Sequence, residues 1–246
     1  ARLENGVLGA ATVLFRQLPK VSGSGHFGSR LVFAPDKTLY ITLGDRQQGS
    51  PAQEPLSHLG KVVRIHRDGS LPPSLAIGGG APGLWSLGHR NPQGAALHPT
   101  TGELWLTEHG PQGGDELNIA RFNRNYGWPL IAYGQEYSGR PIGQGATVRE
   151  GLQQPVYYWD PVIAPSGAQW YSDDAFPAWR GNLFVGALKG RALVRLVLQD
   201  GRVVGEERLL AERGQRVRDV RQGPDGALYV VTDESRGEVW KITPGS

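Results

Sequence analysis

The sequence contains neither cysteine nor methionine among its 246 residues. The absence of cysteine excludes disulfides and thiolate metal sites, and it is compatible with any cellular compartment. Because a natural chain begins with methionine, the absence of methionine predicts a processed or truncated form of a longer protein. The sequence also lacks any run of about eighteen apolar residues, so we expect no transmembrane helix and no membrane insertion.

An excess of charge of one sign is also missing, because the net charge is only +3. Proteins that bind nucleic acids usually concentrate lysine and arginine on one face, whereas here the arginines are scattered over loops, so we expect no nucleic-acid partner. Glycine and proline are abundant instead, with 36 and 18 residues. This composition disfavours a helical bundle and favours an all-β domain with many tight turns.

One pattern recurs along the chain: a strand, a turn rich in Pro, Asp or Gly, and a second strand in which leucine precedes an aromatic residue. The pattern occupies residues 31–42, 96–107 and 220–232, with a looser copy at 176–186. Such turn residues are typical of β-hairpins. A second kind of strand, with alternating apolar and polar residues, is expected within residues 60–69, 191–201 and 237–243.

These repeats predict small antiparallel sheets of about four strands each, which is the content of a β-propeller blade. Separate β-sandwich domains are the alternative, but they would not explain the repeated leucine–aromatic strand. We therefore expect one propeller domain over residues 1–246, with about four blades visible. A six-bladed ring would need roughly 100 further residues, so we expect N-terminal blades to be missing. The polar, Gly-rich stretch at 133–155 is expected to be a surface loop.

A histidine and a set of cations are candidates for chemistry. His26 lies in a flexible Gly/Ser loop before the first repeated strand. An ordinary histidine has a pKa of about 6.5, which suits a general base. A surface histidine without a role is the simpler alternative. Propeller loops converge at one end of the axis, so cations from separate blades could surround one anionic ligand, unless they are ordinary solvated charges. The cations in question are Arg90, Lys189, Arg216 and Arg218.

The loop at residues 107–116 combines a Gly110–Pro111 pair with His109, Asp115 and Glu116. Backbone carbonyls and carboxylates are the oxygen ligands that Ca²⁺ prefers, so this loop is a candidate cation site. A plain Gly–Pro turn with an aspartate cap is the alternative. The spacing of Arg216 and Arg218 is more specific, because period two along a strand places both side chains on the same face.

The chain resembles the soluble quinoprotein aldose sugar dehydrogenases of the glucose/sorbosone dehydrogenase family. The resemblance rests on ordered motifs at residues 25–31, 43–45, 60–64, 87–94, 108–111, 115–116, 125–129, 163–167, 188–190 and 216–219. It implies a six-bladed, all-β propeller of four-stranded antiparallel sheets that binds pyrroloquinoline quinone (PQQ) and Ca²⁺ at one end of the axis. It also implies a periplasmic or secreted location and a monomer or weak dimer. The resemblance implies a physiological electron acceptor as well, whose identity is unknown.

The resemblance further implies roles for individual residues. His26 would be the catalytic base for the anomeric hydroxyl, and Arg90 would lie near the quinone carbonyls. The residues implied to contact the cofactor are Arg90, Asn91, His109, Lys189, Arg216 and Arg218. The residues implied to bind calcium are Gly110, Pro111, Glu116 and Tyr126. The residues implied near the sugar are Asp115, Tyr157 and Asp160.

Departures from the family pattern favour its broad-specificity aldose branch. Gly25 replaces an acidic residue beside the base of the glucose enzyme, His109 replaces a glutamine, and Asp160 replaces an aromatic residue. The implied reaction is hydride transfer from C1 of an aldose to the quinone, which gives the lactone. A metal-dependent sugar lactonase is one alternative, although it would not need a ring of cations. A non-catalytic propeller that binds a partner is the other, although it would not need to keep His26.

Overall fold

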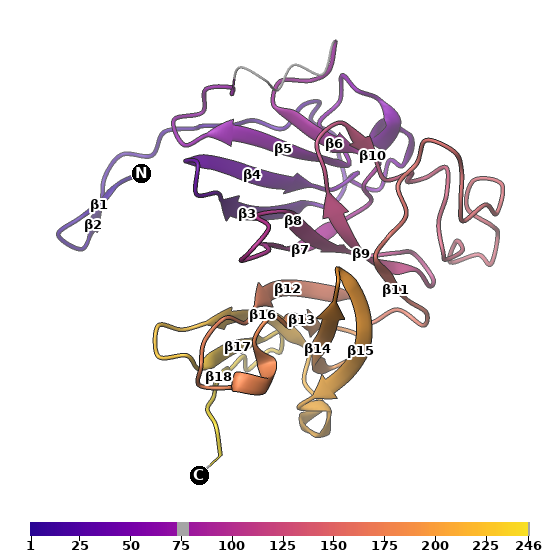
Figure 1. The fold of residues 1–246 in the computed structure, drawn as a ribbon. Coiled ribbons are helices and arrows are strands. Elements are labelled where there is room, and N and C mark those ends of the chain that lie inside the picture. The colour runs from indigo at the N-terminus through magenta and orange to yellow at the C-terminus, as the bar shows by residue number, and fades with distance from the viewer. Residues whose placement is uncertain (73–78, 246) are drawn as a thin grey trace.

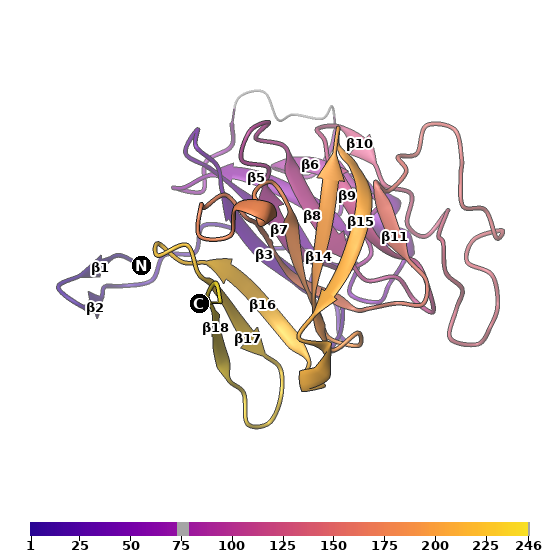
Figure 2. The ribbon, with the colours of Figure 1, turned by 60° about the horizontal axis from the view of Figure 1, so that its bottom comes forward.

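A computed structural model describes residues 1–72 and 79–245 of the chain. Within these residues the secondary structure is β-strand, apart from three short 3₁₀ turns, η1 (Ser50–Gln53), η2 (Pro177–Trp179) and η3 (Ala211–Arg213). No helix in the described ranges has the length and apolar character needed to cross a bilayer. The strands form four main sheets, arranged in chain order in Figures 1 and 2, and a small N-terminal hairpin of β1 (Leu3–Glu4) and β2 (Val7–Leu8).

The first two sheets are built from adjacent hairpins. Sheet 1 has the order β10-β6-β5-β4-β3, and sheet 2 has the order β11-β9-β8-β7. The strands of sheet 1 are β3 (Gly28–Phe33), β4 (Thr38–Leu43), β5 (Lys61–His66), β6 (Leu84–Leu87) and the parallel β10 (Arg124–Asn125). Those of sheet 2 are β7 (Pro92–Leu97), β8 (Leu104–Glu108), β9 (Asp115–Ala120) and β11 (Tyr157–Trp159).

The last two sheets are entirely antiparallel. Sheet 3 has the order β12-β13-β14-β15 and sheet 4 the order β16-β17-β18. The strands of sheet 3 are β12 (Pro165–Trp170), β13 (Leu183–Ala187), β14 (Ala192–Gln199) and β15 (Arg202–Leu209). Those of sheet 4 are β16 (Val217–Gln222), β17 (Leu228–Thr232) and β18 (Val239–Ile242).

The sheets pack face to face, and the first strand of each sheet contacts the first strand of the next: β3 contacts β7, β7 contacts β12, and β12 contacts β16. The apolar core lies between neighbouring sheets, as in a propeller. Tyr40 and Leu106 belong to the cluster between sheets 1 and 2, Trp105 and Trp170 to that between sheets 2 and 3, and Phe184 to that between sheets 3 and 4. The predicted all-β propeller is therefore confirmed, with β3, β7, β12 and β16 as the inner strands.

The repeats found in the sequence correspond to the inner hairpins, with one exception. Residues 31–42, 96–107 and 220–232 fall in the hairpins β3–β4, β7–β8 and β16–β17. The looser copy at 176–186 was wrong in its first half, because Pro177 opens η2 and the strand that pairs with β13 is β12. The expected strands are present as β5, β14 and β18, but only β18 alternates in exposure, because the first three residues of β5 and of β14 are all buried.

The strand number per sheet varies more than the repeats predict. Sheets 2 and 3 have the expected four strands, whereas sheet 1 has five and sheet 4 has three among the described residues. The stretch at 133–155 contains no strand, only isolated bridges from Gln135 to Gln112 and to Pro141, so the expected loop is confirmed. It projects beyond sheets 1 and 2 on the right of Figure 1.

One ion pair joins inner strands of the first and last sheets. Arg30 of β3 donates from Nη1 to Asp219 Oδ2 of β16 at 2.9 Å, and its Nε donates to the Gln93 carbonyl of β7 at 3.1 Å. The two ionic side chains are only 20% and 26% exposed. Because the partners lie 189 positions apart in the sequence, this contact ties the ends of the sheet array together across the inner strands.

We expect the Arg30–Asp219 pair to contribute to stability more than surface ion pairs do. In a double-mutant cycle of Arg30→Met and Asp219→Asn, the coupling free energy should be about 1 kcal/mol, since a half-buried pair is poorly screened. The measurement is urea unfolding of the four proteins. The exposed pair Arg180–Asp174, at 57% and 82% exposure, is the control and should give a coupling close to zero. Equal coupling for both pairs would contradict the proposed role.

Candidate active site

The site residues occupy equivalent positions in the four sheets. In each inner hairpin the beginning of the first strand pairs with the end of the second: Gly28 with Leu43, Pro92 with Glu108, Pro165 with Ala187, and Val217 with Thr232. Residues just before the first strand and just after the second must therefore lie at the same end of the sheets. The residues at these positions are His26 and Asp45, Asn91 and His109, Ala164 and Lys189, and Arg216 and Asp233.

His26 and Asp45 form the central hydrogen bond of this end, with 2.6 Å between His26 Nδ1 and Asp45 Oδ1. Asp45 is 1% exposed and also accepts hydrogen bonds from the Gln47 backbone N–H at 2.8 Å and from Trp128 Nε1 at 2.7 Å. Burial alone raises the pKa of Asp45, but these hydrogen bonds and the nearby His26 outweigh burial and lower it below its usual range. Asp45 is therefore an ionised acceptor that orients the imidazole.

The His26 imidazole faces a cavity of about 450 Å³, which we call the mouth cavity. Its polar lining includes Asp45, Gln48, Arg90 and Glu136, and its walls include Pro111, Trp128 and Tyr137. Since Nδ1 is bonded to Asp45, Nε2 is the nitrogen that remains for a ligand, and it has no hydrogen bond to the described part of the chain. This geometry suits a general base.

Arg90 connects the mouth cavity to the predicted cation loop. Its Nη1 donates to the carbonyl oxygens of His109 at 3.0 Å and Gly110 at 2.8 Å, and its backbone N–H donates to Glu108 Oε2 at 2.8 Å. The Arg90 side chain is buried, and its Nε has no partner among the described residues. An acceptor atom on a ligand is the natural partner for such a buried donor.

His109 directly follows β8 and Asn91 directly precedes β7, so both lie at the same end of sheet 2 as Arg90. His109 Nε2 lies 2.7 Å from the Pro165 carbonyl, which fixes Nε2 as the donor. Burial, together with the nearby charges of Arg90, His26 and Arg218, lowers the pKa of His109 to about 4, so the ring is neutral near pH 7. Asn91 Oδ1 accepts the Gly28 N–H at 3.2 Å, so this side chain supports the loop that carries His26.

Arg216 and Arg218 share one carboxylate, which confirms that they point to the same face. Arg216 donates from Nη2 to Asp233 Oδ2 at 2.7 Å, and Arg218 donates from Nε to Asp233 Oδ1 at 3.0 Å. The hydrogen bond from Arg218, together with that from Arg216, lowers the pKa of Asp233. Lys189 and Asp160 line a separate cavity of about 690 Å³ beside the 133–155 loop.

Two of the three predicted sugar contacts have hydrogen-bond partners within the protein. Asp115 is 1% exposed, and its two carboxylate oxygens accept backbone N–H groups of Gly110 at 2.8 Å and Ala164 at 2.7 Å, so it supports loops instead. Burial raises the pKa of Asp115 to about 6. Tyr157 points to the core between sheets 2 and 3 and donates its hydroxyl to Glu206 at 3.0 Å.

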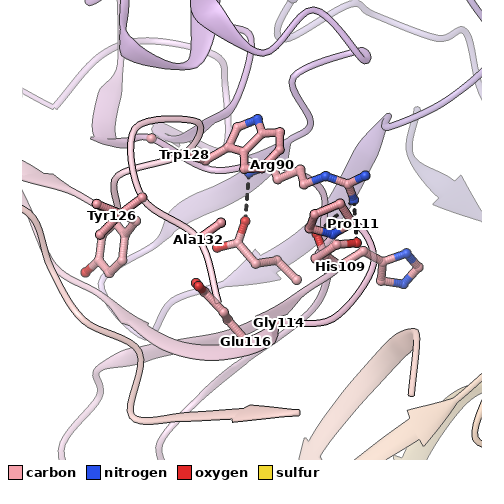
Figure 3. A pocket seen from close by; sticks show the side chains of 12 residues that line it. Arg90, His109, Pro111, Gly114, Glu116, Tyr126, Trp128 and Ala132 are labelled. Carbon is pink, nitrogen blue, oxygen red and sulfur yellow. Dashed lines mark hydrogen bonds between the residues drawn. The ribbon is translucent and has the colours of Figure 1, made fainter. Parts of the chain in front are cut away.

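A small inner cavity of about 20 Å³ lies beside the mouth cavity and is lined by Glu108, Glu116, Tyr126, Trp128 and other residues (Figure 3). Asn118 Nδ2 donates to Glu108 at 3.0 Å and to Glu116 at 2.9 Å, while Asn118 Oδ1 is buried without a partner in the described ranges. Burial raises the pKa of Glu116, and the charge of Glu108 raises it further. Two close carboxylates and an unpaired acceptor are an environment that a cation would stabilise.

No group of three or more His, Asp or Glu side chains that could hold a metal is found in residues 1–72 and 79–245. A cation here would therefore need backbone oxygens as well. The predicted ligands Gly110, Pro111 and Glu116 and the backbone of Tyr126 all line the inner cavity. The Tyr126 hydroxyl is not available as a ligand, because it donates to the Ile119 carbonyl.

The sequence interpretation gave no role to Asp45, Glu108, Trp128 or Asp233, although all four contact predicted site residues. A signal was present for two of them. Asp45 and Asp233 each follow the second strand of an inner hairpin, the position that Lys189 and His109 occupy in the other sheets. Trp128 and Glu108 act through tertiary contacts that no local pattern shows.

The array of inner strands defines a β-propeller, and polar side chains from the strand ends gather at one end of its sheets. The family model named "Glucose / Sorbosone dehydrogenase" matches residues 1–241. The chain belongs to the glucose/sorbosone dehydrogenase family.

Three relatives illustrate the similarity. Aldose sugar dehydrogenase YliI of Escherichia coli (strain K12) is 46% identical over 235 residues, which cover 94% of this chain and 63% of that protein. A solved glucose dehydrogenase structure shares 48% identity with a TM-score of 0.93, covering 95% of this chain and 69% of that one. The PQQ-bound aldose sugar dehydrogenase of Streptomyces coelicolor shares 29% identity with a TM-score of 0.77, covering 97% and 66%. The chain spans between 59% and 63% of the length of the curated relatives it matches.

The contact between Gly44 and His26 gives a test of the site geometry. A Cβ on Gly44 would lie 2.0 Å from the His26 carbonyl oxygen, so Gly44→Ala must displace the backbone of His26. We expect a loss of about 1–3 kcal/mol in the free energy of unfolding and a change in the His26 imidazole NMR signals. In Gly205→Ala, the control, the new Cβ would lie 3.6 Å from its nearest neighbour, and both readouts should stay unchanged. Wild-type behaviour of Gly44→Ala would disprove the packing.

Proposed function

We propose that the protein oxidises aldose sugars at C1 to the lactone, with PQQ and Ca²⁺ as cofactors. The observation that carries the proposal is the His26–Asp45 pair at a mouth cavity that Arg90 and Pro111 also line. Membership of the family and the likeness to a PQQ-bound relative support it. PQQ would supply the two-electron acceptor and Ca²⁺ a Lewis acid.

The residues present fit an anionic cofactor. PQQ carries three carboxylates, and the two guanidiniums of Arg216 and Arg218 share the single carboxylate of Asp233, so this group keeps a net positive charge that would attract an anion. Arg90 offers a buried Nε donor without a partner in the described residues. Neutral His109 can accept a hydrogen bond at Nδ1, since its Nε2 is bonded to Pro165. Arg90, Asn91, His109, Lys189, Arg216 and Arg218 therefore remain the proposed cofactor contacts.

The proposed role of the chain in the reaction is proton transfer and orientation. His26 would accept the proton of the anomeric hydroxyl at Nε2, while Asp45 holds Nδ1–H and stabilises the resulting imidazolium. Polar groups of the mouth cavity, among them Gln48 and Glu136, would orient the sugar, and Tyr137 offers an exposed aromatic ring. Asp160 stays a proposed sugar contact from the neighbouring cavity. A periplasmic or secreted location is part of the proposal by family resemblance.

The decisive experiment adds PQQ and Ca²⁺ to the purified full chain and follows quinone reduction by a panel of aldoses in absorbance scans. We expect reduction with wild type and the His66→Ala control, whose histidine lies at the end of β5. His26→Ala should lose at least about a hundredfold in kcat, the usual contribution of a general base, with PQQ affinity changed less than about threefold. Hydrolysis of lactones without quinone reduction would support the lactonase alternative, and turnover in His26→Ala would remove His26 from the mechanism.

A second test concerns the proposed cation of the inner cavity. Because a cation would relieve the repulsion between Glu108 and Glu116, Ca²⁺ at about 100 times its dissociation constant should stabilise the protein by about 2.7 kcal/mol. Glu116→Gln should weaken this stabilisation, as measured by Tm in Ca²⁺ against EDTA. Glu103→Gln, at an exposed ion pair with Arg121, is the matched control and should respond like wild type. An equal Ca²⁺ response in both variants would contradict the assignment of Glu116.

A further inference from the structure

The indole of Trp128 contacts both Asp45, the partner of His26, and Arg90, which holds the loop at Gly110. Its Nε1 donates to Asp45 Oδ2 at 2.7 Å, while the other oxygen of the same carboxylate is bonded to His26 Nδ1 at 2.6 Å. The indole N–H is therefore the second side-chain donor, besides His26, to the carboxylate that orients the imidazole. Backbone N–H groups also donate to this carboxylate, from Gln47 to Oδ1 at 2.8 Å and from Gly49 to Oδ2 at 3.3 Å, so Trp128 supplies the shorter of the two contacts that hold Oδ2.

The face of the same ring lies against Arg90. The Arg90 Cζ atom is 5.2 Å from the Trp128 ring centroid, within the range of a cation–π contact, and Figure 3 shows the two side chains together at the edge of the inner cavity. Arg90 in turn holds the carbonyls of His109 and Gly110. Trp128 also lines both the mouth cavity and the inner cavity. One side chain thus contacts the proton-transfer pair and the arginine of the cofactor loop.

The backbone of Trp128 is held by a closed set of amide hydrogen bonds. Gln53 Nε2 donates to the Trp128 carbonyl at 2.6 Å and to Asn125 Oδ1 at 3.1 Å, and Asn125 Nδ2 donates back to Gln53 Oε1 at 2.7 Å. The Trp128 N–H donates to the Gly88 carbonyl at 3.0 Å. These contacts fix the segment to sheet 1, so the indole N–H is directed at Asp45 by the surrounding structure.

We propose that Trp128 is a positioning residue for proton transfer, which acts by holding the Asp45 carboxylate toward His26 and Arg90 toward the Gly110 loop. The inference rests on the proposed function for its kinetic part and on the geometry alone for its structural part. The other charged or titratable groups around Asp45 are His26, Arg90 and, across the mouth cavity, Glu136. Arg46 turns away from the cavity and donates to the carbonyls of Gly23 and Gly25.

The strength of Asp45 as an acceptor depends on its hydrogen bonds. These donors outweigh the effect of burial and lower the pKa of this carboxyl. Removal of the indole N–H takes away one donor, so the carboxylate is held less firmly and its pKa rises. The effect is measured through kcat and through the His26 Nδ1 proton.

The test uses Trp128→Phe, which keeps an aromatic ring over Arg90 and deletes the N–H. We expect kcat to fall by about tenfold or more and KM to change less than about threefold. The matched control is Trp159→Phe, which deletes a similar N–H bond, from Nε1 to Glu206 at 2.8 Å, between sheets 2 and 3. The control should leave kcat unchanged.

A readout without cofactor separates this inference from the proposed function. In the cofactor-free protein, the low-field NMR signal of the His26 Nδ1 proton should weaken or broaden in Trp128→Phe and persist in Trp159→Phe. Persistence of the signal in Trp128→Phe would overturn the inference, whatever the outcome of the sugar assays. Loss of the signal together with no aldose oxidation by wild type would retain the positioning role and reject the proposed function.

Double mutants guard against a simple loss of folding. If Trp128 acts through Asp45, then Trp128→Phe should have little further effect on kcat in an Asp45→Asn background. Additive losses in kcat would overturn the inference. Trp128→Leu, which also removes the ring face from Arg90, should additionally weaken PQQ binding relative to Trp128→Phe. Equal PQQ affinity in the two variants would overturn the part of the inference that concerns Arg90.

Discussion

The buried carboxylate of Asp45 is the constraint around which the site is built. A charge that is 1% exposed is costly to bury unless hydrogen bonds replace its water. The backbone N–H groups of Gln47 and Gly49 supply two donors locally, and the two side-chain donors come from other segments: His26 precedes β3, and Trp128 belongs to the segment between β10 and β11. The fold brings these segments together at Asp45, and the contact orients the His26 imidazole toward the mouth cavity.

The antiparallel hairpin explains why one end of the molecule collects the chemistry. Each inner hairpin places the start of its first strand beside the end of its second, so four hairpins supply eight positions at one end of the inner strands. In sheet 1 these positions carry a base and its carboxylate, and in sheet 4 they carry Arg216 and Asp233. Blades of similar structure thus present different polar side chains at the same end of the molecule.

The repeats were visible in the sequence because hairpins depend on local turn residues and on strand periodicity. Contacts between residues far apart in the chain have no such local signal. The family resemblance implies that Tyr157 lies near the sugar, whereas the structure pairs Tyr157 with Leu117 in sheet 2 and its hydroxyl donates to Glu206. Asp115 has the charge of a ligand contact, and only the tertiary fold shows that two backbone N–H groups occupy both of its oxygens. Asp45 lies in the motif at residues 43–45, but its partner His26 is 19 positions away, so the local sequence does not reveal their hydrogen bond.

The peptide between His109 and Gly110 shows why buried charges of both signs are needed beside the cation loop. A trans peptide directs its N–H and its C=O to opposite sides. The Gly110 N–H donates to Asp115 at 2.8 Å, so the His109 carbonyl must face the other way, where Arg90 donates to it at 3.0 Å. The same guanidinium nitrogen holds the Gly110 carbonyl at 2.8 Å. The loop is thus fixed between an acceptor on one side, Asp115, and a donor on the other side, Arg90. Since Asp115 also holds the Ala164 N–H, the rigidity of the loop is shared with sheet 3. A carboxylate whose two oxygens both accept backbone N–H groups can therefore determine where the loop presents its carbonyl oxygens.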